Sequence, residues 1–266
     1  MPAAPQLRFE PEREEAELRD YLGSHYERRR LEHYQDVLDA EVAEVADAET
    51  LYRTSKAYLY NLTAFAMSGT KMPYLEALTR VVPPGSRLLD YGCGIGSDGL
   101  MLLEAGYRVE FADFDNPSTE FLRWRLARRG LEAPVYDLDH GVPDGFDAAY
   151  AFDVIEHVPD ARAFLAEMER RARLVVVNFL EFDRHEQDLH YRLPIGRLLM
   201  RAAGRGLKYY EIHHGSSHLV IYGPEPAAAQ RRLANLARLG RGLAPRAAAP
   251  MRRVAGALRH GAVRSA

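Results

Sequence analysis

The amino-acid sequence predicts an α/β fold, with a seven-stranded, mostly parallel sheet, an antiparallel last strand and an N-terminal helical segment. Apolar residues recur at helical spacing from Glu12 to Leu78. After a break at Pro83, Pro84 and Gly85, short apolar runs alternate with helical stretches, which is typical of βαβ units around a parallel sheet. A chain of 266 residues with 47% hydrophobic residues is long enough for one such domain with additional helices.

The helical segment predicts a cap in front of the sheet domain. The run SKAYLYNLTAFAMSG is apolar nearly all round and is therefore expected to be buried. The changes of pattern divide the chain into a helical cap over residues 1–82, a sheet domain over 83–225 and a basic, mobile tail over 226–266. We expect two to four helices in the cap, because apolar side chains repeat at helical spacing at Leu31, Tyr34, Leu38, Val42 and Val45.

Seven apolar runs in the sheet domain are candidate strands. Only the four residues HGSS separate the last two runs, so these two are expected to pair as an antiparallel hairpin. The other strands are separated by helical stretches, which predicts parallel pairing. The candidates are Arg87–Tyr91, Arg108–Ala112, Ala133–Tyr136, Phe146–Phe152, Leu174–Phe179, Tyr209–His213 and His218–Tyr222.

The net charge of −3 conceals an uneven distribution of charge along the chain. Residues 1–50 carry 14 acidic and six basic side chains, whereas residues 226–266 carry nine Arg and no Asp or Glu. These two ends could attract each other, but the tail is rich in Ala, Gly and Pro, which favours a mobile, partly helical extension. The acidic head argues against nucleic acid as a partner, and no basic stripe interleaved with aromatic residues is present.

Cysteine content and hydropathy restrict the location of the protein. Cys93 is the only cysteine, which excludes an intramolecular disulfide. Apolar stretches such as Leu174–Val177 are far too short to cross a bilayer, so no membrane partner is expected. The first residues contain no apolar signal segment, and we therefore expect a cytoplasmic protein. The sequence is compatible with a homo-oligomer as well as with a monomer.

A glycine-rich turn, LLDYGCGIGSDG, stands where the first predicted strand passes into a helix. It contains Asp90 followed by Gly92, Gly94 and Gly96, and glycines at such a turn let the backbone approach a ligand closely. The helix that follows adds free backbone N–H groups and a positive dipole end. Gly94, Gly96 and Gly99 also fit the GxGxxG pattern of dinucleotide-binding proteins, so this turn alone does not distinguish an NAD enzyme.

Carboxylates at the ends of the next strands favour an adenosyl ligand, because ligands of open α/β sheets bind at the carboxyl ends of the strands. Asp113 ends the second strand in VEFADFD, where it is suited to accept hydrogen bonds from both ribose hydroxyls. Phe114 is placed to flank an adenine ring. Asp137 ends the third strand in VYDLD and could accept from the adenine amino group, although a role as a local cap stays open.

In this order, DxGxGxG, ADFD, YDLD and FDVIEHV resemble the class I S-adenosylmethionine-dependent methyltransferase superfamily, in its small-molecule branch. The resemblance covers about Arg87–Phe179, and it implies a Rossmann-like fold, S-adenosylmethionine as cofactor and methyl transfer as activity. The family pattern places the methionine part on the first turn, the ribose and adenine at the second and third strand ends, and the sulfonium at the fourth. The cofactor-binding residues implied in this way are Asp90, Tyr91, Gly92, Cys93, Gly94, Gly96, Asp113, Phe114, Asp137, Leu138, Phe152 and Asp153.

Histidines beyond the fourth strand are the candidate catalytic residues. Imidazole suits a general base near neutral pH, and His157 and His190 follow the strands whose loops line the acceptor pocket in the family. The predicted site contains no metal, but Asp153, Glu156 and His157 have i, i+3, i+4 spacing, and His190 could add a fourth ligand. This pattern resembles the ExxEH element of small-RNA 2′-O-methyltransferases and ubiquinone-pathway O-methyltransferases, which use a divalent ion.

We therefore expect methyl transfer to an oxygen, nitrogen or carbon nucleophile of a small molecule, with a role in natural-product biosynthesis suggested by the Arg- and Ala-rich composition. The N-terminal helices and the segment Glu181–Leu207 are expected to cover this acceptor. One alternative is an RNA 2′-O-methyltransferase with a divalent metal at the DxxEH element. Another is an enzyme that retains the cofactor on the same fold without methylating, since a fold does not fix a chemistry.

Overall fold

The sheet of the computed structural model confirms the predicted seven strands and their mostly parallel pairing. The structure describes residues 5–42, 48–181 and 190–243. Seven strands pair in the order β3-β2-β1-β4-β5-β7-β6, with parallel pairing from β3 to β5 and antiparallel pairing of β7 with both β5 and β6. The strands are β1 (Arg87–Tyr91), β2 (Arg108–Asp113), β3 (Val135–Asp137), β4 (Ala148–Ala151), β5 (Val175–Leu180), β6 (Arg205–His213) and β7 (Ser217–Pro226).

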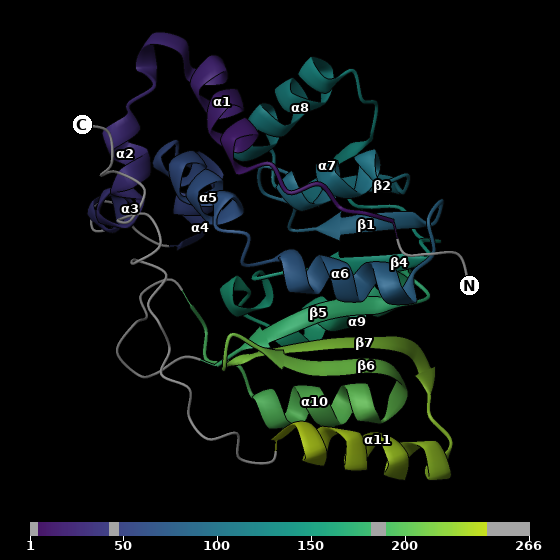
Figure 1. Ribbon diagram of the computed structural model, residues 1–266. Helices are drawn as coiled ribbons and strands as arrows, with labels where there is room; N and C mark the ends of the chain where they lie inside the picture. The colour runs from purple at the N-terminus through teal and green to yellow at the C-terminus, as the bar shows by residue number, and fades with distance from the viewer. Residues whose placement is uncertain (1–4, 43–47, 182–189, 244–266) are drawn as a thin grey trace, which may run out of the picture.

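Helices cover both faces of this sheet and bury its apolar side chains (Figure 1). On one face, α6, α7 and α8 pack on side chains such as Leu88 and Val109; on the other, α9, α10 and α11 pack on side chains such as Ala149 and Val175. Alternate residues of each strand therefore serve opposite layers, as the pleat of a strand requires. These helices are α6 (Met72–Val81), α7 (Ser97–Glu104), α8 (Pro117–Arg129), α9 (Ala161–Arg171), α10 (Ile195–Ala203) and α11 (Ala229–Leu243).

The N-terminal segment forms a helical cap at one edge of the sheet. Figure 1 shows α2, α3, α4 and α5 grouped on the side toward which the arrow of β1 points, and α1 beside α8. The expectation of two to four helices was too low, because turns divide the segment before α6 into five short α-helices and one 3₁₀ turn. They are α1 (Pro11–Leu22), η1 (Gly23–His25), α2 (Arg28–Glu32), α3 (Tyr34–Val42), α4 (Ala48–Thr54) and α5 (Ala57–Met67).

The acidic side chains of α1 pair with the basic face of α8. Arg125 is fully buried and binds Glu14 and Glu17 at 2.6 and 2.7 Å, and Arg129 binds Glu17 at 2.8 Å. Within the described residues, the acidic head is therefore attracted to α8. This contact places the cap on the sheet domain.

The first part of the predicted tail is a packed helix. Leu239 of α11 is buried in the core that α10 and β6 also line, and Asn235 donates to the carbonyls of Ala203 and Arg205 at 3.0 and 3.1 Å. Residues 229–243 thus form a helix that packs on the sheet domain, whereas residues 244–266 lie outside the described part of the chain. Among the described residues, none of the helices combines the length and apolar character that crossing a membrane requires.

Candidate functional site

The glycine-rich turn between β1 and α7 brings backbone to the carboxyl edge of the sheet. Gly92, Gly94 and Gly96 have φ values of 82°, 52° and 73°, a region that side chains rarely adopt. A Cβ atom on Gly92 would lie only 2.6 Å from Cγ1 of Val154, which follows β4. The turn therefore requires glycine here, because it runs directly against the loop that follows β4.

Asp113 at the end of β2 holds this turn in place. One carboxylate oxygen accepts from the N–H of Gly94 at 2.7 Å, and the other accepts from the N–H of Phe114 at 2.8 Å. Burial raises the pKa of this carboxyl, although the two backbone donors oppose the shift. Each oxygen can accept a second hydrogen bond, so the side chain remains suited to bind a pair of hydroxyls.

Asp90 lies beneath the turn, packed against the first turn of α7. A Cβ atom on Gly99 would be 2.9 Å from its Oδ2, and the carboxyl interacts with the buried hydroxyl of Tyr150. Burial, followed by the charge of Asp98, raises the pKa of Asp90 to about 8. Asp90 is thus placed to support the turn from below.

The expected adenine end is closed by a residue of the cap. The guanidinium of Arg53, on α4, lies 3.9 Å from the ring centre of Phe114 and pairs with both carboxylate oxygens of Asp139 at 2.7 and 3.1 Å. The carboxylate of Asp137 accepts from the N–H of Asp139 and contacts the ring of His140 at 2.7 Å. Asp137 therefore organises its own loop, and its contact with adenine stays a prediction.

The end of β4 carries a strained aspartate. Asp153 has φ 55°, and Asn178 of β5 fixes it on both sides: its Oδ1 accepts from the N–H of Asp153 at 2.8 Å, and its Nδ2 donates to the carboxylate at 2.6 Å. Asn178 also donates to Ser217, which accepts from the hydroxyl of Tyr74 at 2.7 Å. A chain of hydrogen bonds across β5, β7 and α6 thus sets the direction of the Asp153 side chain.

The DxxEH element does not form the expected helical turn. Ile155–His157 is a 3₁₀ turn, η2, entered from the left-handed Asp153, so the i, i+3, i+4 spacing does not place the three side chains on one helix face. Within residues 5–42, 48–181 and 190–243, no three His, Cys, Asp or Glu side chains form a group that could hold a metal ion.

The two candidate catalytic histidines lie side by side. The ring centres of His157 and His190 are 4.5 Å apart, and the backbone N–H of Tyr191 donates to the carbonyl of Glu156 at 2.6 Å. Tyr52 of α4 reaches across to His157, with its hydroxyl 2.7 Å from Nδ1. The cap therefore orients one of the two histidines.

The other histidines beyond β5 have structural contacts. His218 is buried on β7, 2.9 Å from the hydroxyl of Tyr210, and burial lowers its pKa. His213 packs edge-on against Tyr74, and His214 contacts the carbonyl of Thr70 at 2.9 Å. His185 and Phe182, which were expected near the acceptor, lie outside the described residues.

Two of the predicted cofactor residues, Tyr91 and Phe152, direct their rings into the core. Tyr91 packs on Phe164, and Phe152 packs between Tyr74 and Tyr150. Only the backbones of these two residues are then placed to contact a ligand. For Tyr91 this agrees with the prediction, which used the backbone from Tyr91 to Gly96.

Two polar residues of the cap join the site, and sequence reasoning assigned neither of them to the cofactor. Burial raises the pKa of Tyr58 on α5, and the charges of Asp113, Glu156 and Asp153 raise it further. Lys71, which precedes α6, lies 3.3 Å from Asp98 and also interacts with Asp153. The signal for Lys71 was its rarity, because the chain has only three lysines.

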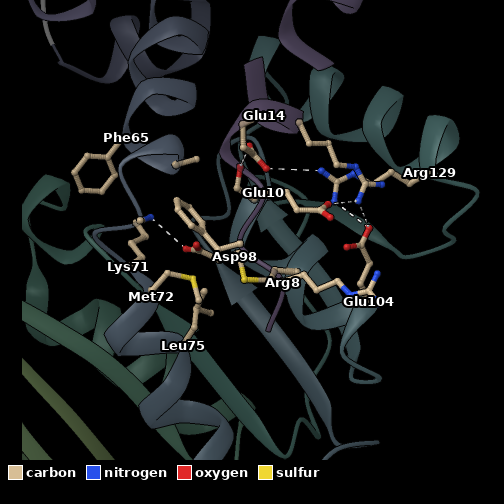
Figure 2. Close-up of a pocket in the computed structure, with 16 residues that line it drawn as sticks. Arg8, Glu10, Glu14, Phe65, Lys71, Met72, Leu75, Asp98, Glu104 and Arg129 are labelled. Carbon is tan, nitrogen blue, oxygen red and sulfur yellow. Dashed lines mark hydrogen bonds and ion pairs between the residues drawn. The ribbon is translucent and has the colours of Figure 1, made fainter. Parts of the chain in front are cut away.

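A small cavity adjoins the site beside Lys71. Figure 2 shows Lys71 extending toward Asp98, with Phe65, Met72 and Leu75 around it. The volume of about 30 Å³ holds water but no nucleoside. This cavity by itself is therefore too small to be the site of an adenosyl ligand.

The residues present fit S-adenosylmethionine. The glycine turn offers exposed backbone, Asp113 retains acceptor capacity for the ribose, and Lys71 offers a cation for a carboxylate. Buried oxygens without a hydrogen-bond partner among the described residues remain on Asp153 and Glu156. The family pattern places one of these two residues, Asp153, beside the positively charged sulfur.

Comparisons with known proteins assign the centre of the chain to a family. A family model described as a methyltransferase domain matches residues 89–173. The ubiquinone biosynthesis O-methyltransferase of Xanthomonas campestris pv. campestris is 30% identical over 105 residues, which cover 38% of this chain and 43% of that protein. The bifunctional methionine biosynthesis protein MetXA/MetW of Rhodopirellula baltica is 29% identical over 130 residues, 44% of this chain and 20% of that protein.

The similarity in structure is wider than the similarity in sequence. The PH0226 protein from Pyrococcus horikoshii OT3 matches 64% of this chain and 92% of its own, with a TM-score of 0.51 and 16% identity, which shows a common fold. The chain spans less than half the length of the two curated relatives above. The resemblance seen in the sequence is confirmed: the chain carries a class I methyltransferase domain, whose cofactor is S-adenosylmethionine.

Proposed function

We propose that this protein transfers the methyl group of S-adenosylmethionine to an oxygen, nitrogen or carbon nucleophile of a small molecule. The observation that carries the proposal is the convergence of the glycine turn, Asp113 and Asp153 at one edge of the sheet, beneath residues of the helical cap. The role in natural-product biosynthesis belongs to the same proposal and rests on composition alone.

The chain's own residues divide the work of binding. The backbone from Tyr91 to Gly96, supported by Asp90, holds the methionine part, with Lys71 as partner for its carboxylate. Asp113 accepts from the ribose. The remaining predicted contacts surround the adenine and the sulfur, and they come from Phe114, Asp137, Leu138, Phe152 and Asp153.

When bound, S-adenosylmethionine supplies a methyl group on a positively charged sulfur, already activated for in-line displacement. A lone pair of the acceptor forms the new bond to the methyl carbon, while the electron pair of the carbon–sulfur bond leaves with sulfur. The protein mainly positions the two partners and removes a proton where the acceptor carries one. We assign that proton to His157, oriented by Tyr52, with His190 beside it.

The binding part of the proposal is tested by calorimetry with S-adenosylhomocysteine. Asp113→Ala should lose about 1.5–3 kcal/mol of binding free energy, because it removes hydrogen bonds from hydroxyls to a charged acceptor. Asp115→Ala is the matched control, since Asp115 is exposed two residues away and pairs with Arg123. A wild-type protein that binds NADH and ignores S-adenosylhomocysteine would refute the proposal.

The catalytic part is tested by turnover. Candidate acceptors are incubated with S-adenosylmethionine, and S-adenosylhomocysteine is quantified together with the methylated product. His157→Ala should reduce kcat about 10²- to 10⁴-fold with little change in cofactor affinity, as expected for loss of a general base. Loss of cofactor binding instead would assign His157 to the cofactor site. The divalent-metal RNA methyltransferase is not proposed, since the described residues contain no suitable metal-binding group.

A further inference from the structure

Two carboxyl groups that follow β4 each have a buried oxygen without a hydrogen-bond partner among the described residues. Glu156 is 1% exposed, and its Oε2 has no hydrogen-bond partner among the described residues. Asp153 gives one oxygen to Asn178, while its Oδ2 is equally buried and, in the same part of the chain, without a hydrogen-bond partner. A buried carboxylate oxygen without a donor is costly, because nothing replaces the water that it gave up.

The surroundings of this pair are aromatic and poor in positive charge. The charge of Glu156 acts on the phenols of Tyr52 and Tyr58, whose ring centres are 5.4 Å apart. Lys71 interacts with both carboxyls, but its ammonium lies 3.3 Å from Asp98 and is paired there. When both carboxyls are ionised, their two negative charges therefore exceed the positive charge that nearby side chains supply.

We infer that Asp153 and Glu156 form a subsite for a protonated amine carried by the methyl acceptor. The inference rests on the proposed function and narrows its substrate class. Carboxylates supply the charge-assisted hydrogen bonds that an ammonium group needs, and the faces of Tyr52 and Tyr58 suit a cation. The subsite adjoins the histidine pair along the backbone, because Glu156 directly precedes His157 and its carbonyl accepts from the N–H of Tyr191, which follows His190.

The protonation of Glu156 agrees with this assignment. Burial, followed by the charge of Asp153, raises the pKa of Glu156 to about 8. Near neutral pH Glu156 thus holds a proton, which an arriving cation would displace. An ammonium group requires fewer ligands than a metal ion, which fits a part of the chain without a three-ligand group.

The test uses methylammonium chloride, because the ion is small enough to enter without fitting the rest of the acceptor site. The full-length protein is saturated with S-adenosylhomocysteine, whose sulfur is neutral. Methylammonium should raise the melting temperature above that in sodium chloride of equal ionic strength, and methanol should not. Glu156→Gln should lower the affinity for methylammonium at least tenfold while S-adenosylhomocysteine affinity stays within threefold. Gln matches the shape of the protonated acid, so the variant is expected to fold.

Glu132→Gln is the matched control, because Glu132 is an exposed carboxylate far from β4 in the sequence. If Glu156→Gln does not fold, Glu156→Leu, which also removes the buried carboxyl, is measured in the same way. Equal shifts in wild type and variant would overturn the inference. Binding of Mg²⁺ that depends on Glu156 would replace it by a metal site. If Glu156→Gln changes only the ratio of the affinities for S-adenosylmethionine and S-adenosylhomocysteine, and not the affinity for methylammonium, the pair contacts the cofactor sulfur instead. Failure to bind S-adenosylhomocysteine at all would instead contradict the proposed function.

Discussion

Replacing Arg125 by methionine removes the centre of the ion network that fastens the cap to α8. The Arg125 side chain is fully buried and donates to Glu17 at 2.7 Å and to Glu14 at 2.6 Å. It also donates to the carbonyl of Ile95 and to Oγ of Ser97, both at 2.9 Å. Methionine retains much of the aliphatic volume and removes all four of these hydrogen bonds.

The expected loss of stability is about 3 kcal/mol, at the lower end of the ~3–5 kcal/mol that breaking a buried ion pair costs. The reason is that Glu17 keeps Arg129, which donates to both of its oxygens at 2.8 Å. Burial alone would raise the pKa of Glu17, but Arg129 and Arg125 together lower it below its ordinary value. In Arg125→Met, Glu17 therefore still has Arg129 as a partner, and its buried charge is not left uncompensated.

Urea unfolding measures this loss, and the chain provides its own reporter. Trp124, the only tryptophan, contacts Tyr21 of α1, so its fluorescence follows the contact between cap and α8. The control is Arg128→Met, which breaks the ion pair with Asp20 across the same two helices. That pair is 47% and 41% exposed, so its loss should cost about 1 kcal/mol or less. If Arg125→Met and Arg128→Met lose unfolding free energies within 1 kcal/mol of each other, the argument that burial makes the Arg125 pairs more costly to break is refuted.

Three further perturbations have defined outcomes. Gly92→Ala should be about 1–3 kcal/mol less stable than Gly85→Ala, because both force alanine to φ near 80° but only the first meets a neighbouring side chain; equal losses would contradict this. Asp90→Asn should flatten the decline in unfolding free energy between about pH 4 and 8, since a carboxyl whose pKa is raised to about 8 stabilises the fold only while protonated; unfolding at pH 6 and 9 measures the slope. Arg53→Ala should weaken S-adenosylhomocysteine binding about two- to fivefold, as loss of ~0.5–1 kcal/mol of stacking on Phe114 implies; an unchanged Kd by calorimetry would exclude this role.

The sheet was predictable because its signals are local. Apolar runs, the glycine turn and the acidic strand ends follow one another along the chain, and the short link between the last two runs indicates their antiparallel hairpin. The boundaries were less accurate where pairing decides them. Phe146 forms only an isolated bridge with Ala172, so β4 begins two residues later than predicted. β6 begins four residues earlier than predicted, because irregular pairing with β7 extends it to Arg205.

The part of the site that belongs to the cap was not predictable from the sequence. Tyr58, Lys71 and Arg53 reach the strand ends only because helices fold over the sheet, and periodicity does not encode that placement. The DxxEH element was misread for a related reason. Its spacing suggests a helix face, but the side chain of Asn178, on another strand, holds Asp153 in a left-handed conformation.

Stability of the cap and affinity for the cofactor should be linked, because they share a residue. Ile95 stands between two glycines of the turn, and its carbonyl accepts from Arg125. Ser97, the first residue of α7, accepts from the same guanidinium and donates to Glu14 of α1 at 2.6 Å. Arg125→Met should therefore loosen the turn as well as the cap and weaken S-adenosylhomocysteine binding, whereas Arg128→Met, which touches neither Ile95 nor Ser97, should leave the Kd unchanged. If β1 and Asp113 alone hold the turn rigid, the two variants will have the same Kd for S-adenosylhomocysteine, which would contradict the link.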